Sequence, residues 1–343
     1  MPGQPGTVTA ALPSPYLLFL GDTVEPSYAK TAFGLCDWAP ERCVGELVLS
    51  GATVTTGLAS LQPGEAFERG ARALLIGVAT RGGHIPESWL PTLIDALRAG
   101  LDIVSGMHDR LRDIPPLAAE ADRLGRQLID VRVPPAEIPI ATGRKRSGRR
   151  LLTVGTDCAL GKKYTALAIA RGLQARGIDA EFRATGQTGI MIAGGGIPID
   201  AIVSDFVAGA AEMLSPDAEP DHLDVIEGQG SLFHPSYAAV TLGLLHGSQP
   251  DLFVVCHDPG RTHVLGLADF ALPSIEQLIE LTVALGRVVN PAIRCCGISL
   301  NTSALDDGAA AAVIASTAHR LGLPVADPVR GIGMMALLDA CVA

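Results

Sequence analysis

The residues best suited to chemistry lie in the run Leu151–Thr165, where glycines, threonines and lysines follow an apolar stretch. A strand predicted over 151–155 leads into a turn that closes on Gly161 and Lys162, and an alanine-rich helix is predicted from Tyr164. In such a turn, backbone N–H groups point inward, the helix N-terminus adds positive charge, and the lysine reaches bound phosphates. The spacing therefore predicts a P-loop that binds a phosphorylated ligand.

The predicted loop departs from the usual pattern at one position. P-loops normally end in Gly-Lys-Ser/Thr, whose hydroxyl binds magnesium, whereas this chain has Lys163 there. Oxygens of Thr156, Asp157 or Thr165 would rebuild a metal contact, which would suit a magnesium nucleotide. A second lysine instead favours a ligand with extra phosphate charge and no metal, and coenzyme A fits that description. We predict that the cofactor-binding residues are Gly155, Thr156, Asp157, Cys158, Gly161, Lys162, Lys163, Tyr164 and Thr165, and we predict no metal ligands.

Two carboxylates are the candidate catalytic residues. Glu227 ends a strand predicted over 225–227, so burial is expected to raise its pKa towards neutrality. In P-loop folds an acidic residue at the end of a neighbouring strand faces the phosphates. The other interpretation of Glu227 is a carboxylate that accepts N–H groups from the adjoining glycine turn. Asp205 lies in a helix predicted over 201–214, where it either faces the cleft or satisfies a neighbouring helix end.

Four residues are candidates for binding the substrate. Gln187 and Thr188 lie in a predicted glycine-flanked loop, which either binds a carboxylate through its amides or is a plain turn. Arg261 either clamps a carboxylate or phosphate or lies at the surface. His234 is either a base or a structural histidine. We interpret Cys158 as a small packing residue, because no histidine lies near it in the sequence.

Composition excludes several classes of protein. The formal net charge of -10 over 343 residues argues against a general nucleic-acid-binding role. The chain contains no apolar run of about 18 or more residues, so no membrane span is predicted. Its first residues lack the pattern of a secretory signal. The seven cysteines form no Cys-x-x-Cys pair, and their odd number fits a reducing cytoplasm. We expect a cytoplasmic enzyme with a small-molecule substrate.

The alternation of predicted strands and helices indicates an α/β protein with two mostly parallel sheets. We expect a disordered lead over 1–15, a Rossmann-like domain over 16–135, a basic and proline-rich linker over 136–150, and a doubly wound P-loop domain over 151–343. The predicted strands are 16–20, 44–49, 73–78, 101–105, 128–131, 151–155, 180–183, 225–227, 252–257 and 293–300. The predicted helices are 86–99, 115–125, 164–175, 201–214, 274–285 and 309–321. The basic run 144–150 is interpreted as either solvated linker or a rim that attracts a polyanionic cofactor.

Several long motifs of the chain are distinctive when taken together. They are Gly155-Thr156-Asp157-Cys158 with Gly161-Lys162, Ala184-Thr185-Gly186-Gln187-Thr188-Gly189, Ser204-Asp205-Phe206, and Glu227-Gly228-Gln229-Gly230-Ser231 followed by His234. These motifs resemble the DgcN-type D-glutamate N-acetyltransferase family. The resemblance covers nearly the whole chain, with further likeness in Ala29–Leu35 and Gly106–His108. A more distant likeness, in the P-loop and Glu227-Gly228, is to dethiobiotin synthetase, which uses ATP and magnesium.

The resemblance implies transfer of an acetyl group from acetyl-CoA to the amino group of D-glutamate or a related D-amino acid. The P-loop and Lys162 would then hold coenzyme A phosphates, and Glu227 or Asp205 would accept a proton from the substrate. The alternative is an ATP- and magnesium-dependent kinase or carboxylate–amine ligase, against which Lys163 argues. A nucleotide-sensing regulatory protein is a third interpretation. We also expect a homodimer.

Overall fold

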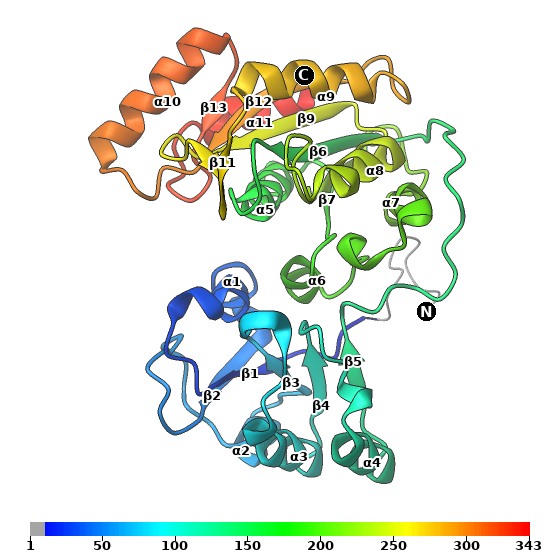
Figure 1. The fold of residues 1–343 in the computed structure, drawn as a ribbon, viewed down its shortest axis with the longest axis vertical. Coiled ribbons are helices and arrows are strands. Elements are labelled where there is room, and N and C mark those ends of the chain that lie inside the picture. The colour runs from blue at the N-terminus through cyan, green and yellow to red at the C-terminus, as the bar shows by residue number, and fades with distance from the viewer. Residues whose placement is uncertain (1–10) are drawn as a thin grey trace. The chain divides into compact units, whose positions relative to one another are not determined.

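The computed structural model describes residues 11–343, so most of the predicted lead 1–15 lies outside the described residues. The described chain forms two compact units (Figure 1). One unit holds the chain up to Pro134 together with Gln187–Pro198. The other holds Pro135–Gly186 and Ile199–Ala343. A short segment from the middle of the P-loop sequence therefore belongs to the N-terminal unit.

The N-terminal unit is built on a parallel five-stranded sheet in the order β2-β1-β3-β4-β5. Strand β1, which lies between β2 and β3, is apolar and buried along its whole length, as expected for a parallel sheet covered on both faces. The strands are β1 (Tyr16–Gly21), β2 (Cys43–Val48), β3 (Ala73–Ile76), β4 (Asp102–Ser105) and β5 (Leu128–Asp130). The helices are α1 (Lys30–Trp38), α2 (Pro63–Glu68), α3 (Leu90–Arg98), α4 (Pro115–Leu124) and α6 (Gln187–Ala193). The Rossmann-like prediction is confirmed.

The second unit is built on a parallel six-stranded sheet in the order β13-β12-β9-β6-β8-β7. Its strands are β6 (Arg149–Gly155), β7 (Ala180–Arg183), β8 (Leu223–Ile226), β9 (Leu252–His257), β12 (Arg294–Leu300) and β13 (Val325–Ala326). Its helices are α5 (Lys162–Gln174), α7 (Val207–Leu214), α8 (Ala238–Ser248), α9 (Ile275–Gly286), α10 (Asp307–Leu321) and α11 (Met334–Val342). Strands β10 (His263–Val264) and β11 (Leu267–Ala271) form a separate antiparallel hairpin. Short 3-10 turns occur at Pro26–Tyr28, Pro40–Arg42, Arg81–Gly83, Glu87–Trp89, Leu111–Asp113, Ile199–Ala201 and Ser204–Phe206.

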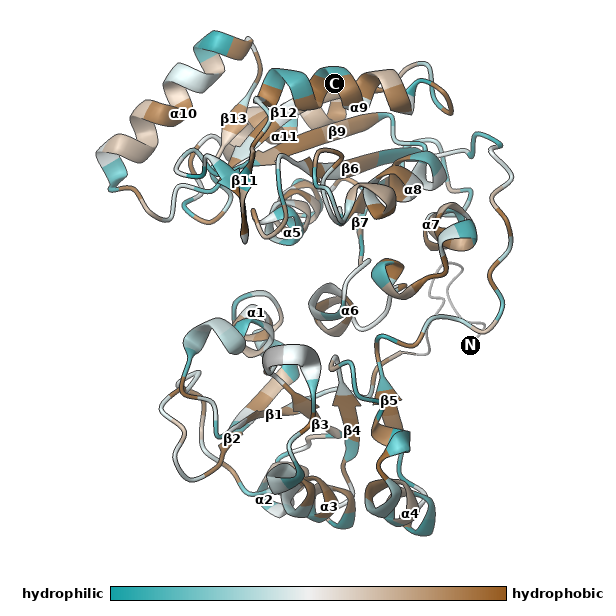
Figure 2. Cartoon of the chain, in the orientation of Figure 1, coloured by the Kyte–Doolittle hydropathy of each residue, from teal (hydrophilic) through white to brown (hydrophobic). Residues whose placement is uncertain are grey.

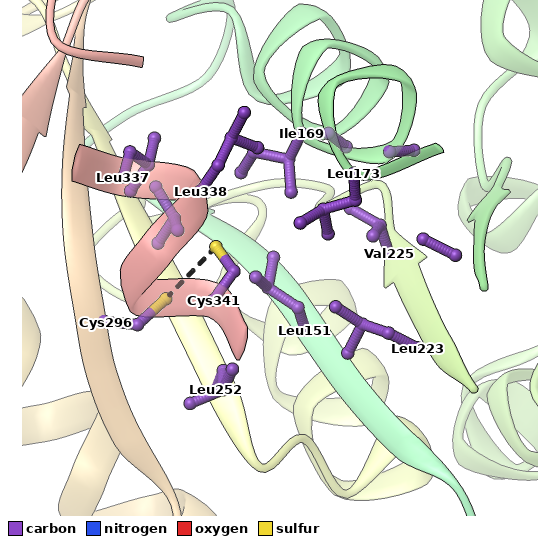
Figure 3. Packing of buried hydrophobic residues seen from close by; sticks show 14 of the residues in the cluster. Leu151, Ile169, Leu173, Leu223, Val225, Leu252, Cys296, Leu337, Leu338 and Cys341 are labelled. Carbon is purple, nitrogen blue, oxygen red and sulfur yellow. Dashed lines mark hydrogen bonds between the residues drawn. The ribbon is translucent and has the colours of Figure 1, made fainter. Parts of the chain in front are cut away.

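The core of this unit holds the P-loop strand in place. Strand β9 is largely apolar, and the centre of β6 is apolar except for Thr153 (Figure 2). Leu151 of β6 packs in one buried cluster with Ile169 of α5 and Leu337 of α11 (Figure 3). Burial on this scale stabilises each large aliphatic side chain by about 1.5–3 kcal/mol. The strand that leads into the loop is therefore anchored in the core of this unit.

Two expectations about local structure are wrong. The segment predicted as a loop at Gln187 and Thr188 is the start of helix α6. The helix predicted over 201–214 begins only at Val207, after two 3-10 turns, because Ser204 and Asp205 lie in the second of them.

The basic run is only partly a solvated linker, because Arg144 and Lys145 are exposed whereas two other arginines of the run are not. Arg146 and Arg150 are buried, and their guanidinium groups donate to backbone carbonyls that include those of Ser215 and Gly247. Arg144 pairs instead with Asp217 at 2.6 Å. The two buried guanidinium groups hold the start of β6, at the opposite end of the strand from the P-loop, so they do not form a rim beside that loop.

No helix within residues 11–343 has the length and apolar character that a membrane span requires.

Candidate functional site

The P-loop follows β6 directly and ends at the first residue of α5. Gly161 takes a left-handed φ of 102°, which glycine adopts without strain, and Ala159 also has a positive φ of 53°. The Lys162 side chain is buried and turns back along the loop, where its Nζ donates to the carbonyl of Asp157 at 2.8 Å. Burial lowers the pKa of Lys162. The first N–H groups of a helix have no partner inside it, so the loop combines donors, a dipole and a buried amine.

A buried ion pair holds the middle of the loop. The carboxylate of Asp157 is fully buried, and its Oδ2 accepts from the Arg261 guanidinium at 2.9 Å and from the N–H of Leu265 at 2.8 Å. Its Oδ1 accepts from the N–H of Cys158 at 2.7 Å. Arg261 also donates to the carbonyl of Cys158 at 2.8 Å. Since Leu265 lies in the turn of the β10–β11 hairpin, both the hairpin and Arg261 are fastened to the P-loop.

The two loop threonines are already engaged. The Thr156 hydroxyl lies 2.9 Å from Nδ1 of His257, and the Thr165 hydroxyl lies 2.7 Å from that of Ser299. Thr165 is buried at the first turn of α5. Position 163 lacks the serine or threonine hydroxyl that normally binds magnesium. The Thr156 or Thr165 hydroxyl could take its place only by giving up its present hydrogen bond.

Glu227 lies immediately after β8 and is buried. Its Oε2 accepts from the N–H groups of Thr185 and Gly186, at 2.9 and 3.1 Å. Burial raises the pKa of Glu227, while the charge of Lys163 and the two N–H groups oppose that rise. The donors lie in the loop after β7 and not in the adjoining glycine turn, so the capping interpretation is wrong as stated. Glu227 is a buried acid with a raised pKa, and its role as a proton acceptor stays a prediction. Its interaction with Lys163 links it to the start of α5.

The glycine after Glu227 permits the close approach of β8 and β6. A Cβ at Gly228 would lie 1.7 Å from the carbonyl oxygen of Thr153 and 3.2 Å from Cδ of Lys162. The N–H of Gly228 donates to the Thr153 hydroxyl at 2.9 Å. Only glycine fits between the P-loop strand and the lysine that serves the loop.

His234 lies near the P-loop although it is distant in sequence. Asp157, Cys158 and His234 each offer a ligand atom, and these atoms lie within 4.8 Å of one another. Nδ1 of His234 accepts from the N–H of Ser236 at 3.1 Å. Burial raises the pKa of the Cys158 thiol. Because Asp157 is already paired with Arg261, this group is poorly suited to a cation.

A second group of metal-capable side chains consists of Glu181, His222 and Asp224. Arg183 pairs with Glu181 at 2.9 Å and with Asp224 at 2.6 Å, and His222 lies 3.0 Å from Asp224. A cation here would meet the guanidinium of Arg183, so the group is an internal ion-pair network.

The remaining predicted residues lie elsewhere. Asp205 is exposed in its 3-10 turn, unlike the buried Glu227. Gln187 and Thr188 belong to the N-terminal unit, where the Thr188 hydroxyl lies 2.9 Å from that of Thr31. A Cβ at Gly106 would lie 3.1 Å from Cγ of Gln187. Helix α6 thus packs on α1 and on the loop that follows β4.

Sequence reasoning considered His257 as either a base or a structural histidine, and the structure places it against Thr156. It missed two contributors to the loop, Ser299 and Leu265. His257 and Ser299 lie at the carboxyl ends of β9 and β12, which flank β6 or its neighbour in the sheet. Polar residues at that edge are the available signal, since ligands of open α/β sheets bind there. Leu265 acts through its backbone N–H, for which side-chain type provides no signal.

The chain matches two family profiles. Residues 139–338 match DUF1611_C, a P-loop domain of unknown function, and residues 42–134 match DUF1611_N, a Rossmann-like domain of unknown function. The chain belongs to the DUF1611 family.

Relatives of this DUF1611 chain include two proteins named D-glutamate N-acetyltransferase. The protein from Tritonibacter scottomollicae is 50% identical over 330 residues, which cover 96% of this chain and 99% of that protein. The protein from a Pseudoalteromonas species is 46% identical over 316 residues, covering 92% and 95%. A crystal structure of a DUF1611 protein from Anabaena variabilis is 35% identical, with a TM-score of 0.83, and covers 95% of this chain and 98% of that one.

Proposed function

We propose that this DUF1611 protein is an N-acetyltransferase that moves the acetyl group of acetyl-CoA to the amino group of D-glutamate or a related D-amino acid. The observation that carries the proposal is the 50% identity, over almost the full length of both chains, to a protein named D-glutamate N-acetyltransferase. Similarity of that extent covers both units, so it includes the P-loop, the Glu227 turn and helix α6.

The P-loop is proposed to hold the phosphates of coenzyme A. Buried Lys162, the inward turn and the N-terminus of α5 support a polyanionic ligand. The absence of a hydroxyl at Lys163, and the engagement of Thr156 and Thr165 with other side chains, favour a ligand bound without magnesium. The same observations disfavour the kinase or ligase alternative.

Glu227 is the proposed proton acceptor. A carboxyl with a raised pKa takes a proton readily near neutral pH, and the substrate amine must lose one before it attacks. The neutral amine adds to the thioester carbonyl and forms a C–N bond. The nitrogen of the tetrahedral intermediate then gives up its extra proton as the C–S bond breaks, and the coenzyme A thiolate takes up that proton and leaves as the thiol. Asp205 is the weaker candidate, because its side chain is exposed whereas that of Glu227 is buried.

The acceptor site is proposed to include Gln187 and Thr188 of α6. The amide and hydroxyl of these side chains are donors suited to carboxylates. His234, buried beside the loop, remains a candidate contact for the substrate. Arg261 is reassigned: its guanidinium is bonded to Asp157 and Cys158, so we propose that it holds the P-loop rather than the substrate.

Cofactor binding is tested by calorimetry with Lys162→Ala. The variant should lose binding of acetyl-CoA, because it loses the buried amine that faces the loop. Retained binding would exclude the P-loop as the coenzyme site. Stabilisation of the unsubstituted protein by ATP and magnesium, and not by acetyl-CoA, would favour the kinase or ligase instead.

The reaction itself is tested by following free thiol release with acetyl-CoA and a panel of D- and L-amino acids. The expected result is release with D-glutamate that exceeds release with L-glutamate. A homodimer and a cytoplasmic location are further proposals, and light scattering of the purified protein tests the first.

A further inference from the structure

The protein itself fixes the imidazole ring of His234, which lies in the loop between β8 and α8. The ring packs against that of Tyr237, with centroids 4.5 Å apart. The backbone N–H of His234 donates to the carbonyl of Ser231 at 3.0 Å, and its carbonyl accepts from the N–H of Ala238 at 3.2 Å. Only 4% of the residue is exposed. The ring is therefore held in place without help from a ligand.

A hydrogen bond from Ser236 decides which ring nitrogen of His234 carries the proton. The backbone N–H of Ser236 donates to Nδ1 at 3.1 Å. A ring nitrogen that accepts a hydrogen bond carries no proton, so the imidazole is neutral and its proton is on Nε2. Within residues 11–343, Nε2 has no hydrogen-bond partner. His234 therefore offers one unused N–H group, while its basic nitrogen is already occupied.

The unused N–H group of His234 is open to a ligand. In the described part of the chain, three side-chain atoms are both fully enclosed and unpaired, and they belong to Tyr16, Gln249 and Thr282. Nε2 of His234 is not one of them, so it keeps contact with solvent although most of the residue is buried. A ligand could therefore reach this donor without any rearrangement of the ring.

The P-loop lies next to this donor. A ring nitrogen of His234, a carboxylate oxygen of Asp157 and the sulfur of Cys158 lie within 4.8 Å of one another. The negative charge of Asp157 is offset by the guanidinium of Arg261 at 2.9 Å. The buried amine of Lys162 belongs to the same loop. An anion that enters the loop would thus meet the N–H of His234 together with the lysine and the backbone donors.

We propose that His234 donates a hydrogen bond from Nε2 to a phosphate oxygen of coenzyme A, and that it is a coenzyme-binding residue rather than a base. The inference rests on the proposed function, because that function supplies the phosphates. His234 keeps its proton throughout the reaction, so only its ability to donate matters. The side-chain amide of glutamine also carries a donor at its end, whereas leucine has none. Glutamine at position 234 should therefore keep the contact that leucine would lose.

The test is calorimetric titration of the whole protein with CoA and with acetyl-CoA. In His234→Leu the Kd for both should rise about tenfold or more, as expected when a hydrogen bond to a charged group is lost. In His234→Gln both should rise less than about threefold. The matched control is His246→Leu, because Nε2 of His246 donates to the carbonyl of Leu285 and not to a ligand. Its Kd values should be unchanged, and melting curves check that all variants are folded.

A second measurement reports on the unsubstituted protein. Nitrogen-15 NMR of its eight histidines, with His234 assigned as the signal absent from His234→Gln, should show the proton on Nε2. Addition of CoA should shift that signal. A proton on Nδ1, or an unchanged Kd for CoA in His234→Leu, would overturn the inference alone. A raised Kd for acetyl-CoA but not for CoA would also overturn it, because the donor would then face the thioester. Failure of the unsubstituted protein to bind CoA would instead remove the proposed coenzyme site and this inference with it.

Discussion

Replacing Arg261 with methionine should destabilise the P-loop unit by about 3 kcal/mol. Asp157 is fully buried, whereas the side chain of Arg261 is 18% exposed. Removing one partner of a buried ion pair costs about 3–5 kcal/mol, because the other charge stays buried without compensation. We take the lower end, since Asp157 keeps the N–H groups of Leu265 and Cys158. For domains of 150–250 residues, this loss corresponds to a fall in melting temperature of about 6–12 °C.

A double-mutant cycle isolates the ion pair from other effects of the substitution. Asp157→Asn removes the buried charge, so Arg261→Met should cost less than about 1 kcal/mol in that background, a coupling of about 2 kcal/mol. Melting curves of the four proteins provide the stabilities. Kinetics should show a raised KM for acetyl-CoA and an unchanged KM for the amino acid. An unchanged melting temperature in Arg261→Met, with a raised KM for the amino acid alone, would refute the reasoning and restore Arg261 as a substrate clamp.

Three further predictions concern other parts of the site. Gly228→Ala should unfold the P-loop unit or abolish acetyl transfer, because the added Cβ would lie 1.7 Å from a carbonyl oxygen of β6. The matched control is Gly64→Ala, where an added Cβ would have no atom within 4 Å. In thermal melting, this control should change the free energy of unfolding by less than about 0.5 kcal/mol. Glu227→Gln should lower turnover by about 100-fold or more with little change in acetyl-CoA affinity. Because the pKa of Glu227 is raised in the folded protein, the protonated side chain stabilises the protein at acid pH, and this stabilisation is lost as the pH rises through the folded-state pKa. Urea titrations at several pH values should show this loss in the unsubstituted protein and not in Glu227→Gln. Thr188→Val removes the hydrogen bond to Thr31 and should raise the KM for the amino acid about fivefold in steady-state assays, without affecting that for acetyl-CoA.

Each of these predictions has a contrary outcome. Normal melting and activity in Gly228→Ala would mean that β8 does not approach β6 as closely as described. Unchanged turnover in Glu227→Gln would remove Glu227 as the proton acceptor. An effect of Thr188→Val on acetyl-CoA rather than on the amino acid would place the coenzyme, and not the acceptor, against α6.

Much of the fold was predictable because its signals are local. Each predicted strand overlaps an observed one, since buried parallel strands are continuous apolar runs bounded by glycine or polar residues. Helix α8 was missed because its residues are apolar on nearly all sides, so no helical period marks it. Helix α6 was missed because glycines flank and interrupt it, as they would a loop.

The sequence by itself determined the P-loop, because the strand, the turn and the helix that form it are contiguous and Lys162 follows the glycine directly. Tertiary structure decided what surrounds that loop. It paired Arg261 with Asp157, brought His234 next to Cys158, and joined Gln187–Pro198 to the N-terminal unit. These contacts join residues far apart in the chain. Which of these residues meet depends on the order of their strands in the sheet, and spacing along the sequence does not specify that strand order.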